Sequence, residues 1–391
     1  MTAHADMSVQ YQHDVLPKAT SDELARQEFV KSFKFHLATQ VAPANRLAFD
    51  SRALPRHRQQ GGAEPSDHCD VQQIMRDDPY FNFWGALQRN SQEQMWLATQ
   101  LMVERDFTGL PVRAGEPLGT LELDASVKTP RYHTLVDIHC MPGGYQSEFA
   151  PEDASNGAVY DRAVHVYAMG RLGPLNADIG DSAAAYVKRA FPALHPKRIL
   201  DLGCTVGHST LPYADAFPDA EIYAIDVGAP VLRYAHARAE ALGKKVHFSQ
   251  QNAEHTNFPD GHFDLIVSHI LVHETSHNAI RNIMREAYRL LAPGGVVLHV
   301  ETPPFRDLDM FDAFMLDWDT RNNNEPYWHA SHELVPAELA EQAGFGAAAA
   351  FEAVQPSAFG MAEAARTHVF QCGDFGGAGS WYIWGARKPG N

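Results

Sequence analysis

Basic side chains are scarce in this chain of 391 residues. Lysine and arginine number 32 against 48 aspartates and glutamates, which gives a formal net charge of −16 at pH 7. Proteins that bind nucleic acid offset the backbone phosphates with a stripe of basic side chains, and the sequence has no such stripe. We therefore expect no nucleic-acid partner, and we expect a small molecule as substrate.

Long apolar runs and paired cysteines are also missing. No segment approaches the roughly 20 apolar residues that a helix needs to cross a bilayer, and the polar start of the chain lacks the apolar core of a signal peptide. The 4 cysteines form no C-x-x-C pair, as expected for reduced thiols. We therefore expect a cytoplasmic protein with no membrane partner.

The most informative segment is a short apolar strand at residues 198–202 that runs into a turn with glycines at Gly203 and Gly207. Glycine lets the backbone approach a ligand closely, and the helix expected from about residue 208 offers free N–H groups nearby. The next apolar run, residues 220–225, ends at Asp226, whose carboxylate can accept both hydroxyls of a ribose. Strand, turn, helix, strand and acid predict the nucleoside-binding half of a doubly wound α/β sheet.

The spacing of the glycines in this turn indicates which kind of cofactor it binds. Dinucleotide-binding turns have three glycines as G-x-G-x-x-G, whereas this turn is Asp201-x-Gly203-x-x-x-Gly207. It resembles motif I of the class I S-adenosylmethionine-dependent methyltransferases, although Thr205 stands where a glycine is usual. The resemblance implies S-adenosylmethionine as cofactor, with its methionine part at Asp201 and the turn, its ribose at Asp226 and its adenine near residues 251–254. The implied cofactor-binding residues are Asp201, Gly203, Cys204, Thr205, Gly207, Asp226, Val227, Asn252, Ala253 and Ser268.

Later segments extend the resemblance over about residues 156–391, with interruptions at 303–332 and 355–379. Strands are expected at residues 246–249, 265–268 and 296–300, a helix at 279–291, and a last, antiparallel strand at 380–388. The implied fold is a Rossmann-like, doubly wound sheet of seven strands. Residues 303–332 interrupt the pattern where the family inserts a helical lid.

Residues 1–155 are predicted to form a separate, mostly helical accessory domain. Residues 81–103 are expected to form a long helix or a helix pair rich in aromatic and apolar side chains. Such a face favours a core or a subunit contact, with a substrate wall as the less common alternative, and it suggests a homodimer. Residues 121–127 and 134–140 alternate as strands do. The domain serves either substrate binding or dimerisation.

The segment His273-Glu274-x-x-His277 matches the signature of zinc peptidases. That signature needs a helix and a later third ligand, whereas here it falls in the loop after the fourth strand, so we do not assign peptidase chemistry. A metal that assists a methyl acceptor through His269, His273 or His277 remains an alternative. We assign no metal ligand from spacing alone.

His273 fits another role better. Ligands of open α/β sheets bind at the carboxyl ends of the strands, which places His273 and Glu301 on the same rim as the glycine turn. In the small-molecule O-methyltransferases that the chain resembles, a histidine at this place removes a proton from the acceptor hydroxyl, and an acid can orient it. His273 is therefore the candidate general base and Glu301 its partner; a purely structural role in the loop is the alternative.

Substrate specificity is expected outside the nucleoside-binding half. The insertion mixes aromatic and polar side chains, as an apolar pocket with a few orienting groups does, although packing against the N-terminal domain would explain the same composition. The candidate substrate-binding residues are His269, His277, Phe314, Trp318, Arg321 and Trp328.

The sequence thus predicts a methyltransferase that acts on a small molecule, with a hydroxyl oxygen as the expected acceptor atom. Transfer to nitrogen, sulfur or carbon is the alternative within the class. A cofactor-binding protein without turnover is the alternative from a different class.

Overall fold

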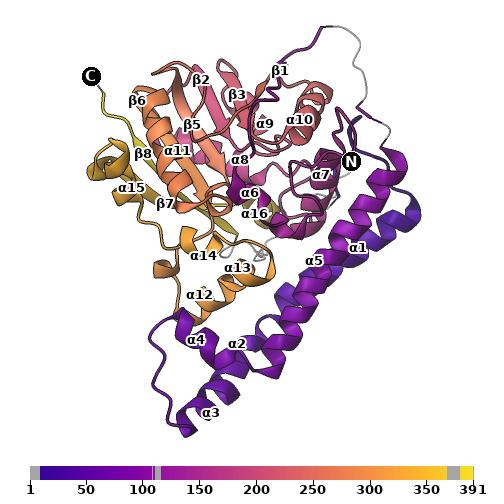
Figure 1. Cartoon of the computed structure of the whole chain (residues 1–391), viewed down its shortest axis with the longest axis vertical. Coiled ribbons are helices and arrows are strands. Elements are labelled where there is room, and N and C mark those ends of the chain that lie inside the picture. The colour runs from indigo at the N-terminus through magenta and orange to yellow at the C-terminus, as the bar shows by residue number, and fades with distance from the viewer. Residues whose placement is uncertain (1–8, 108, 111–115, 368–378, 391) are drawn as a thin grey trace.

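The computed structural model describes residues 9–107, 109–110, 116–367 and 379–390, without the side chains of 363–367. An eight-stranded sheet in the order β1-β4-β3-β2-β5-β6-β8-β7 lies at its centre (Figure 1). The strands are β1 (Thr120–Glu122), β2 (Arg198–Leu202), β3 (Glu221–Asp226), β4 (His247–Gln250), β5 (Phe263–His269), β6 (Leu291–Glu301), β7 (Ala350–Pro356) and β8 (Ser380–Arg387).

The sheet confirms the predicted doubly wound class. β8 pairs antiparallel with both β6 and β7, whereas the pairings among β1 to β6 are all parallel, so β8 alone runs against the rest. The predicted number of seven strands was one too low. The eighth strand is Thr120–Glu122, which overlaps the start of the strand expected at residues 121–127 but ends at Glu122, and which pairs with β4 at the edge of the sheet.

A second N-terminal expectation was wrong. Residues 134–140 do not form a strand: a helix α6 (Arg131–Thr134) is followed by a 3₁₀ turn, η3 (Ile138–Cys140). His139 and Cys140 have φ angles of 53° and 58°, which a strand cannot accommodate. The His139 carbonyl accepts hydrogen bonds from Trp96 Nε1 at 2.7 Å and Gln92 Nε2 at 3.0 Å, so a distant helix holds this turn.

Helices cover both faces of the sheet, as its continuous apolar strands require. One apolar core lies between the sheet and α8, α9 and α10, and a second lies between the opposite face and α11 and α15. These helices are α8 (Asp178–Ala190), α9 (Leu211–Ala216), α10 (Ala229–Ala241), α11 (His277–Leu290) and α15 (Pro336–Ala343). None of the helices in the described ranges has the length and apolar character needed to span a membrane.

The N-terminal helices form a long arm beside the sheet (Figure 1). α1 and α5 pack on α7 and α10 through a third core that includes Val30, Met102 and Tyr234. At the far end of the arm, the segment of α2 to α4 packs on α12 through Phe49, Met75 and Phe314. The arm comprises α1 (Ser21–His36), α2 (Ala44–Ala48), α3 (Leu54–Gln59), α4 (His68–Met75) and α5 (Pro79–Asp106), and it precedes α7 (Ser155–Tyr167).

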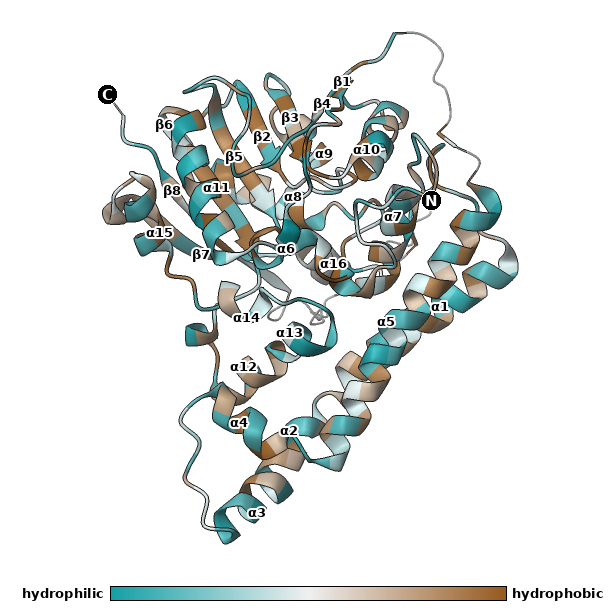
Figure 2. Ribbon diagram, in the orientation of Figure 1, coloured by the Kyte–Doolittle hydropathy of each residue, from teal (hydrophilic) through white to brown (hydrophobic). Residues whose placement is uncertain are grey.

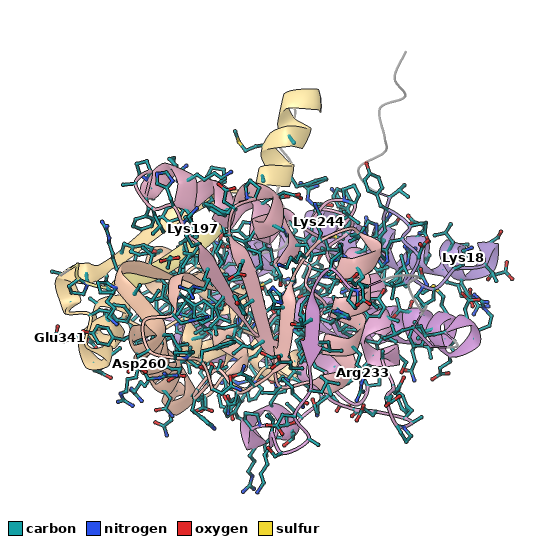
Figure 3. All side chains as sticks on the ribbon, turned by 90° about the horizontal axis from the view of Figure 1, so that it is seen from above. Lys18, Lys197, Arg233, Lys244, Asp260 and Glu341 are labelled. Atoms are coloured by element: carbon teal, nitrogen blue, oxygen red, sulfur yellow. The ribbon has the colours of Figure 1, made fainter. Side chains whose placement is uncertain are left out.

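The insertion at residues 303–332 is helical, as predicted. It contains α12 (Met310–Leu316), α13 (Trp318–Asn322) and α14 (Trp328–Ser331), and α16 (Ala358–Thr367) follows β7. Charged side chains lie around the periphery of the molecule in Figure 3, where the labelled examples are Lys18, Lys197, Arg233, Lys244, Asp260 and Glu341. The cysteines Cys69, Cys140 and Cys204 are free, and Cys372 lies outside the described residues.

Candidate functional site

Two adjoining cavities lie where the parallel strands end. The first, which we call the His273 cavity, encloses about 930 Å³ of empty space, and the second, the Asp226 cavity, about 790 Å³, part of both being open to solvent. The residues that line both are His139, Tyr160, Gly203, Thr205, His269 and Ile270. The cavities therefore share a wall built around the glycine turn after β2.

The glycine turn owes its shape to left-handed backbone. Gly203, Thr205 and Gly207 have φ angles of 70°, 44° and 77°. The N–H groups of Gly203 and Cys204 both donate to the Ile225 carbonyl, at 2.8 and 3.0 Å, and so tie the turn to β3. A Cβ on Gly203 would lie 2.6 Å from Leu271 Cδ1, so only glycine fits there without a shift. The left-handed angle at Thr205 explains in physical terms why glycine is usual at that position.

Asp226 is buried at the end of β3. Its Oδ2 accepts the Thr205 N–H at 2.9 Å and its Oδ1 accepts the Gly228 N–H at 2.8 Å. Burial raises the pKa of Asp226 above its usual value, and the two backbone hydrogen bonds oppose that rise. Because each carboxylate oxygen can accept more than one hydrogen bond, both oxygens retain capacity for ligand hydroxyls.

The Asp226 cavity gathers six of the predicted cofactor-binding residues. Asp226, Val227, Asn252 and Ala253 line it in addition to Gly203 and Thr205 of the shared wall, together with the apolar side chains of Ile225, Leu271 and Ile283. The opposite wall comes from the N-terminal part of the chain, with Pro130, Tyr132, His133 and Tyr145. The cavity thus combines apolar side chains with the carboxylates of Asp226 and Glu274, which suits a nucleoside.

Asp201, Cys204 and Thr205 line the His273 cavity. Asp201 accepts the Thr210 hydroxyl at 2.5 Å and lies 3.2 Å from His269 Nδ1. Two predicted residues reach neither cavity. Gly207 shapes the turn from outside, and the buried Ser268 hydroxyl lies 2.7 Å from His299 Nδ1 within the sheet.

His273 and Glu301 come together as predicted from their positions. His273 Nδ1 lies 2.7 Å from Glu301 Oε2, and Glu301 Oε1 accepts the Val272 N–H at 2.7 Å. Burial by itself lowers the pKa of His273, but the Glu301 charge and hydrogen bond outweigh it, so that the pKa is raised. His273 lines the cavity, and its Nε2 has no hydrogen-bond partner within the described part of the chain.

A second histidine, His139, faces His273 with its ring centre 6.3 Å away. His139 Nδ1 lies 2.8 Å from Glu325 Oε1, and His139 Nε2 lies 3.2 Å from Glu274 Oε1. Burial opposes the charged form of His139, but the two carboxylates prevail and raise its pKa well above the usual value. Sequence reasoning did not assign this side chain a role, because its segment alternates like a strand and lies 134 positions before His273 (273 − 139).

The candidate substrate-binding residues separate into two groups. His269 and Trp328 line the His273 cavity, and the Trp328 ring centre lies 4.7 Å from that of His273. Phe314 packs on Phe81, and Trp318 packs on Trp84, with ring centres 4.9 and 5.4 Å apart. Arg321 and His277 are exposed, and His277 Nε2 lies 3.2 Å from the Ala330 carbonyl instead of approaching His273.

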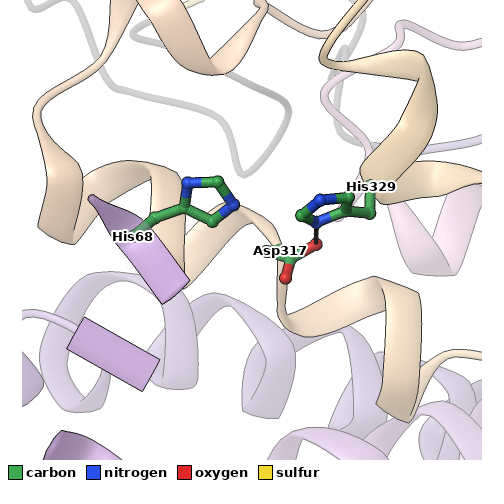
Figure 4. Close-up of side chains that lie close together, drawn as sticks. All are labelled: His68, Asp317 and His329. Atoms are coloured by element: carbon green, nitrogen blue, oxygen red, sulfur yellow. Dashed lines mark hydrogen bonds and ion pairs between the residues drawn. The ribbon is translucent and has the colours of Figure 1, made fainter. Parts of the chain in front are cut away.

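The insertion therefore packs largely against the N-terminal arm, which was the alternative interpretation of its aromatic residues. Figure 4 shows one such junction, where His68 of α4 faces Asp317 and His329. The His329 Nδ1 atom lies 3.0 Å from Asp317 Oδ1. The arm in turn supplies Gln92, Met95 and Trp96 to the His273 cavity. For this aromatic and apolar helix the sequence favoured a core or a subunit contact, with a substrate wall as the less common alternative, and these three side chains form part of a cavity wall.

Comparison with known proteins agrees with a ligand-binding site at the glycine turn and Asp226. Residues 199–295 match a family model described as a methyltransferase domain. The chain is 38% identical over 109 residues to demethylmenaquinone methyltransferase of Thermus thermophilus, covering 28% of this chain and 49% of that protein. It is 34% identical over 120 residues to trans-aconitate 2-methyltransferase of Methylobacterium radiotolerans, covering 31% and 43%.

The match thus spans about half or less of the length of these curated relatives. Among solved structures, phosphoethanolamine N-methyltransferase 2 of Haemonchus contortus aligns over 52% of this chain and 51% of that one, at 18% identity and a TM-score of 0.36. The resemblance to class I S-adenosylmethionine-dependent methyltransferases is confirmed for the central part of the chain by the matched domain.

Proposed function

We propose that this chain, whose residues 199–295 form a methyltransferase domain, transfers a methyl group from S-adenosylmethionine to a small molecule. The observation that supports this most strongly is that the two cavities adjoin at the glycine turn. The Asp226 cavity suits a nucleoside, and the glycine turn and His269 also line the His273 cavity, where an acceptor would lie.

The residues present fit the donor. Asp226 would accept the ribose hydroxyls, Asn252, Ala253 and the apolar side chains of the Asp226 cavity would hold the adenine, and Asp201 would meet the methionine end. When bound, S-adenosylmethionine supplies an electrophilic methyl group on a positively charged sulfur. The protein then has to align the acceptor with that methyl group and exclude water, which the buried walls of both cavities would do.

A hydroxyl acceptor needs to lose its proton. His273 lines the cavity, and Glu301 holds its Nδ1, which leaves Nε2 as the nitrogen that can accept a proton. His273 is our candidate base, Glu301 its positioning partner, and His269 and Trp328 our candidate acceptor contacts. Phe314, Trp318, Arg321 and His277 reach neither cavity, and we assign them to packing and to the surface.

The charged side chains in the cavity lining bear on which class of acceptor can bind. Among the described residues, no lysine or arginine lines the His273 cavity, where the acceptor would lie. Two matched relatives are named for small acceptors, demethylmenaquinone and trans-aconitate, which supports the small-molecule class. A cavity without a lining lysine or arginine offers no positive side chain to pair with an anion such as a carboxylate, which favours a neutral or cationic acceptor.

Self-association through the arm stays part of the proposal. Leu24, Phe29, Phe83, Leu97 and Leu101 of α1 and α5 are exposed, and Figure 2 shows apolar residues along both helices. Burying such side chains between two copies would stabilise a dimer. A molar mass of one chain by light scattering would contradict it.

Donor binding tests the function directly. We expect Asp226→Asn to bind S-adenosylmethionine about 10- to 100-fold more weakly in calorimetry, because hydrogen bonds to a charged group contribute about 1.5–3 kcal/mol. Glu221→Gln, at the exposed start of the same strand, should bind like the parent. Binding of a nicotinamide dinucleotide in place of the donor would overturn the proposal.

Turnover is tested separately from binding. The parent protein should move a labelled methyl group from the donor into a compound of a metabolite extract. Donor binding without any such transfer would favour the non-catalytic alternative.

A further inference from the structure

Three side chains that can ligate a metal meet beside the His273 cavity, and two of them, His139 and His273, line it. His139 comes from η3, His273 from the 3₁₀ turn η4 (Val272–Glu274) after β5, and Glu325 from the insertion. One ligand atom of each lies within 4.8 Å of the others. Sequence spacing had suggested His269 and His277 as companions of His273, but neither belongs to this group.

Two atoms of the group are buried and have no hydrogen-bond partner within the described residues. These are His273 Nε2 and Glu325 Oε2, which lie 3.7 Å apart, on side chains that are 0% and 1% exposed. Leaving a buried polar atom without a partner costs about 1–3 kcal/mol, and such atoms are rare in folded proteins. A ligand that bridges a nitrogen and a carboxylate oxygen would satisfy both.

Each histidine has a carboxylate behind it. Glu301 lies at Nδ1 of His273, and Glu274 lies at Nε2 of His139, which directs His273 Nε2 and His139 Nδ1 toward Glu325. Tyr145 donates its hydroxyl to Glu274 at 2.9 Å and so holds that carboxylate in turn. Metal-ligating histidines are almost always oriented by a carboxylate or carbonyl on the other ring nitrogen.

The backbone at His139 is strained in a way that aims its ring. His139 and Cys140 are consecutive non-glycine residues with positive φ angles, 53° and 58°. Such conformations cost of order 1–3 kcal/mol each and persist where the surrounding structure enforces them. Here Trp96 and Gln92 hold the His139 carbonyl from α5.

The local charge also favours a cation. Glu274, Glu301 and Glu325 surround two imidazoles, and among the described residues no lysine or arginine lines the cavity. Carboxylates that stay buried and ionised need a compensating positive charge. Protons on the histidines supply it in part, so a metal ion would compete with those protons.

We propose that His139, His273 and Glu325 bind one divalent transition-metal ion, with Glu274 and Glu301 as positioning residues. Two imidazoles and one carboxylate suit zinc and its first-row neighbours better than calcium or magnesium, which prefer oxygen ligands. Three protein ligands leave coordination positions for an acceptor atom.

A consequence for the acceptor rests on the proposed function. An acceptor hydroxyl that binds the ion loses its proton to the buffer more easily. Its oxygen then forms the bond to the methyl carbon as the carbon–sulfur bond breaks, which leaves a neutral thioether. In the metal-bound protein His273 is a ligand; only in the metal-free protein can its Nε2 act as the base.

Metal titration of the tag-free, chelator-treated full chain tests the site. Zinc chloride should bind with one tight equivalent in calorimetry, and Co²⁺ should give a visible absorption band from imidazole coordination. Glu325→Gln should weaken zinc binding at least 10-fold, and Glu274→Gln about 10- to 100-fold through loss of orientation. Circular dichroism and thermal melting check that each variant is folded.

The cluster His68, Asp317 and His329 provides the matched control, since it is the other group of ligating side chains found in the described chain (Figure 4). His329→Gln should leave the tight equivalent and the cobalt band unchanged. No tight binding by the parent, or loss of binding in His329→Gln but not in Glu325→Gln, would overturn the proposal. Donor binding is measured without metal, so failure of the metal site and failure of the methyltransferase proposal are distinguishable.

Discussion

The proton transfer proposed at His273 depends on two opposing effects on the pKa of its imidazole, burial and the Glu301 carboxylate. Burial disfavours its charged form, while Glu301 at 2.7 Å stabilises that form and prevails, so the pKa of His273 lies above the usual value of about 6.5. A base must be neutral before it accepts a proton. Activity that depends on this base is therefore lost as the pH falls through the raised pKa.

We expect kcat/KM of chelator-treated protein on a hydroxyl acceptor to rise with pH and to level off above an apparent pKa higher than 6.5. Glu301→Gln removes the charge that raises the pKa, so its profile should shift toward lower pH. The exposed Glu338→Gln should keep the parent profile.

The measurement is the initial rate between pH 5 and 9 at saturating donor. A profile that Glu301→Gln does not move would contradict the base role of His273. Complete loss of activity on chelation would also contradict it, because the metal-free protein is the state in which His273 acts as base.

At the scale of elements, the turn between β2 and α9 combines two separate requirements for glycine. Gly203 has a φ of 70° and also lies against Leu271, where a Cβ would approach Cδ1 to 2.6 Å. Gly243, after α10, has a nearly equal φ of 69° with nothing within 4 Å. Substitutions at Gly203 and Gly243 therefore distinguish the cost of left-handed backbone from the cost of a close contact.

Gly243→Ala should lower the free energy of unfolding by about 1–2 kcal/mol, the cost of a left-handed alanine. Gly203→Ala should lower it further and also weaken donor binding, because Leu271 or the turn has to move. Urea denaturation and donor calorimetry measure the two effects, and Leu271→Ala in the Gly203→Ala background should restore part of both. Equal losses in the two single variants would show that the contact with Leu271 is unimportant.

At the scale of the whole molecule, Asp161 of α7 connects parts that are distant in sequence. Its carboxylate lies within 3.0 Å of Gln10 Nε2, His13 Nε2, His208 Nε2 and the Tyr234 hydroxyl. Burial opposes its charge, yet Arg238 and the two histidines hold its pKa well below the usual value. The N-terminal segment, α7, α10 and the turn after β2 therefore share one buried anion.

Asp161→Asn should lower the free energy of unfolding by about 3–5 kcal/mol, as expected when one partner of a buried charge network is removed. Since the folded-state pKa is depressed, the parent has this contribution above the unfolded value of about 3.9 and loses it as the pH falls through the folded value. Asp215→Asn, in an exposed ion pair with Lys244, should change stability little. Denaturation at pH 7 and at about pH 3 measures both; an equally steep acid dependence in Asp161→Asn would contradict the assignment.

Local patterns in the sequence predict part of the fold and part of the candidate site. Periodicity and backbone sterics over a few residues determine the strand runs, the glycines of the turn and the positions of Asp201 and Asp226. The parallel sheet and the Asp226 cavity could therefore be inferred from neighbouring residues in the sequence. The pairing of His273 with Glu301 followed from one rule about strand ends.

The folded chain was needed to bring His139 and Trp96 to the same cavity and Glu325 next to His139. These residues come from a strained turn, a long helix and an insertion, and their contacts depend on packing between segments that are far apart along the chain. The same packing turned Phe314 and Trp318 toward the N-terminal arm. Long-range packing leaves no local period in a sequence, and for this reason the acceptor end of the site appeared only in three dimensions.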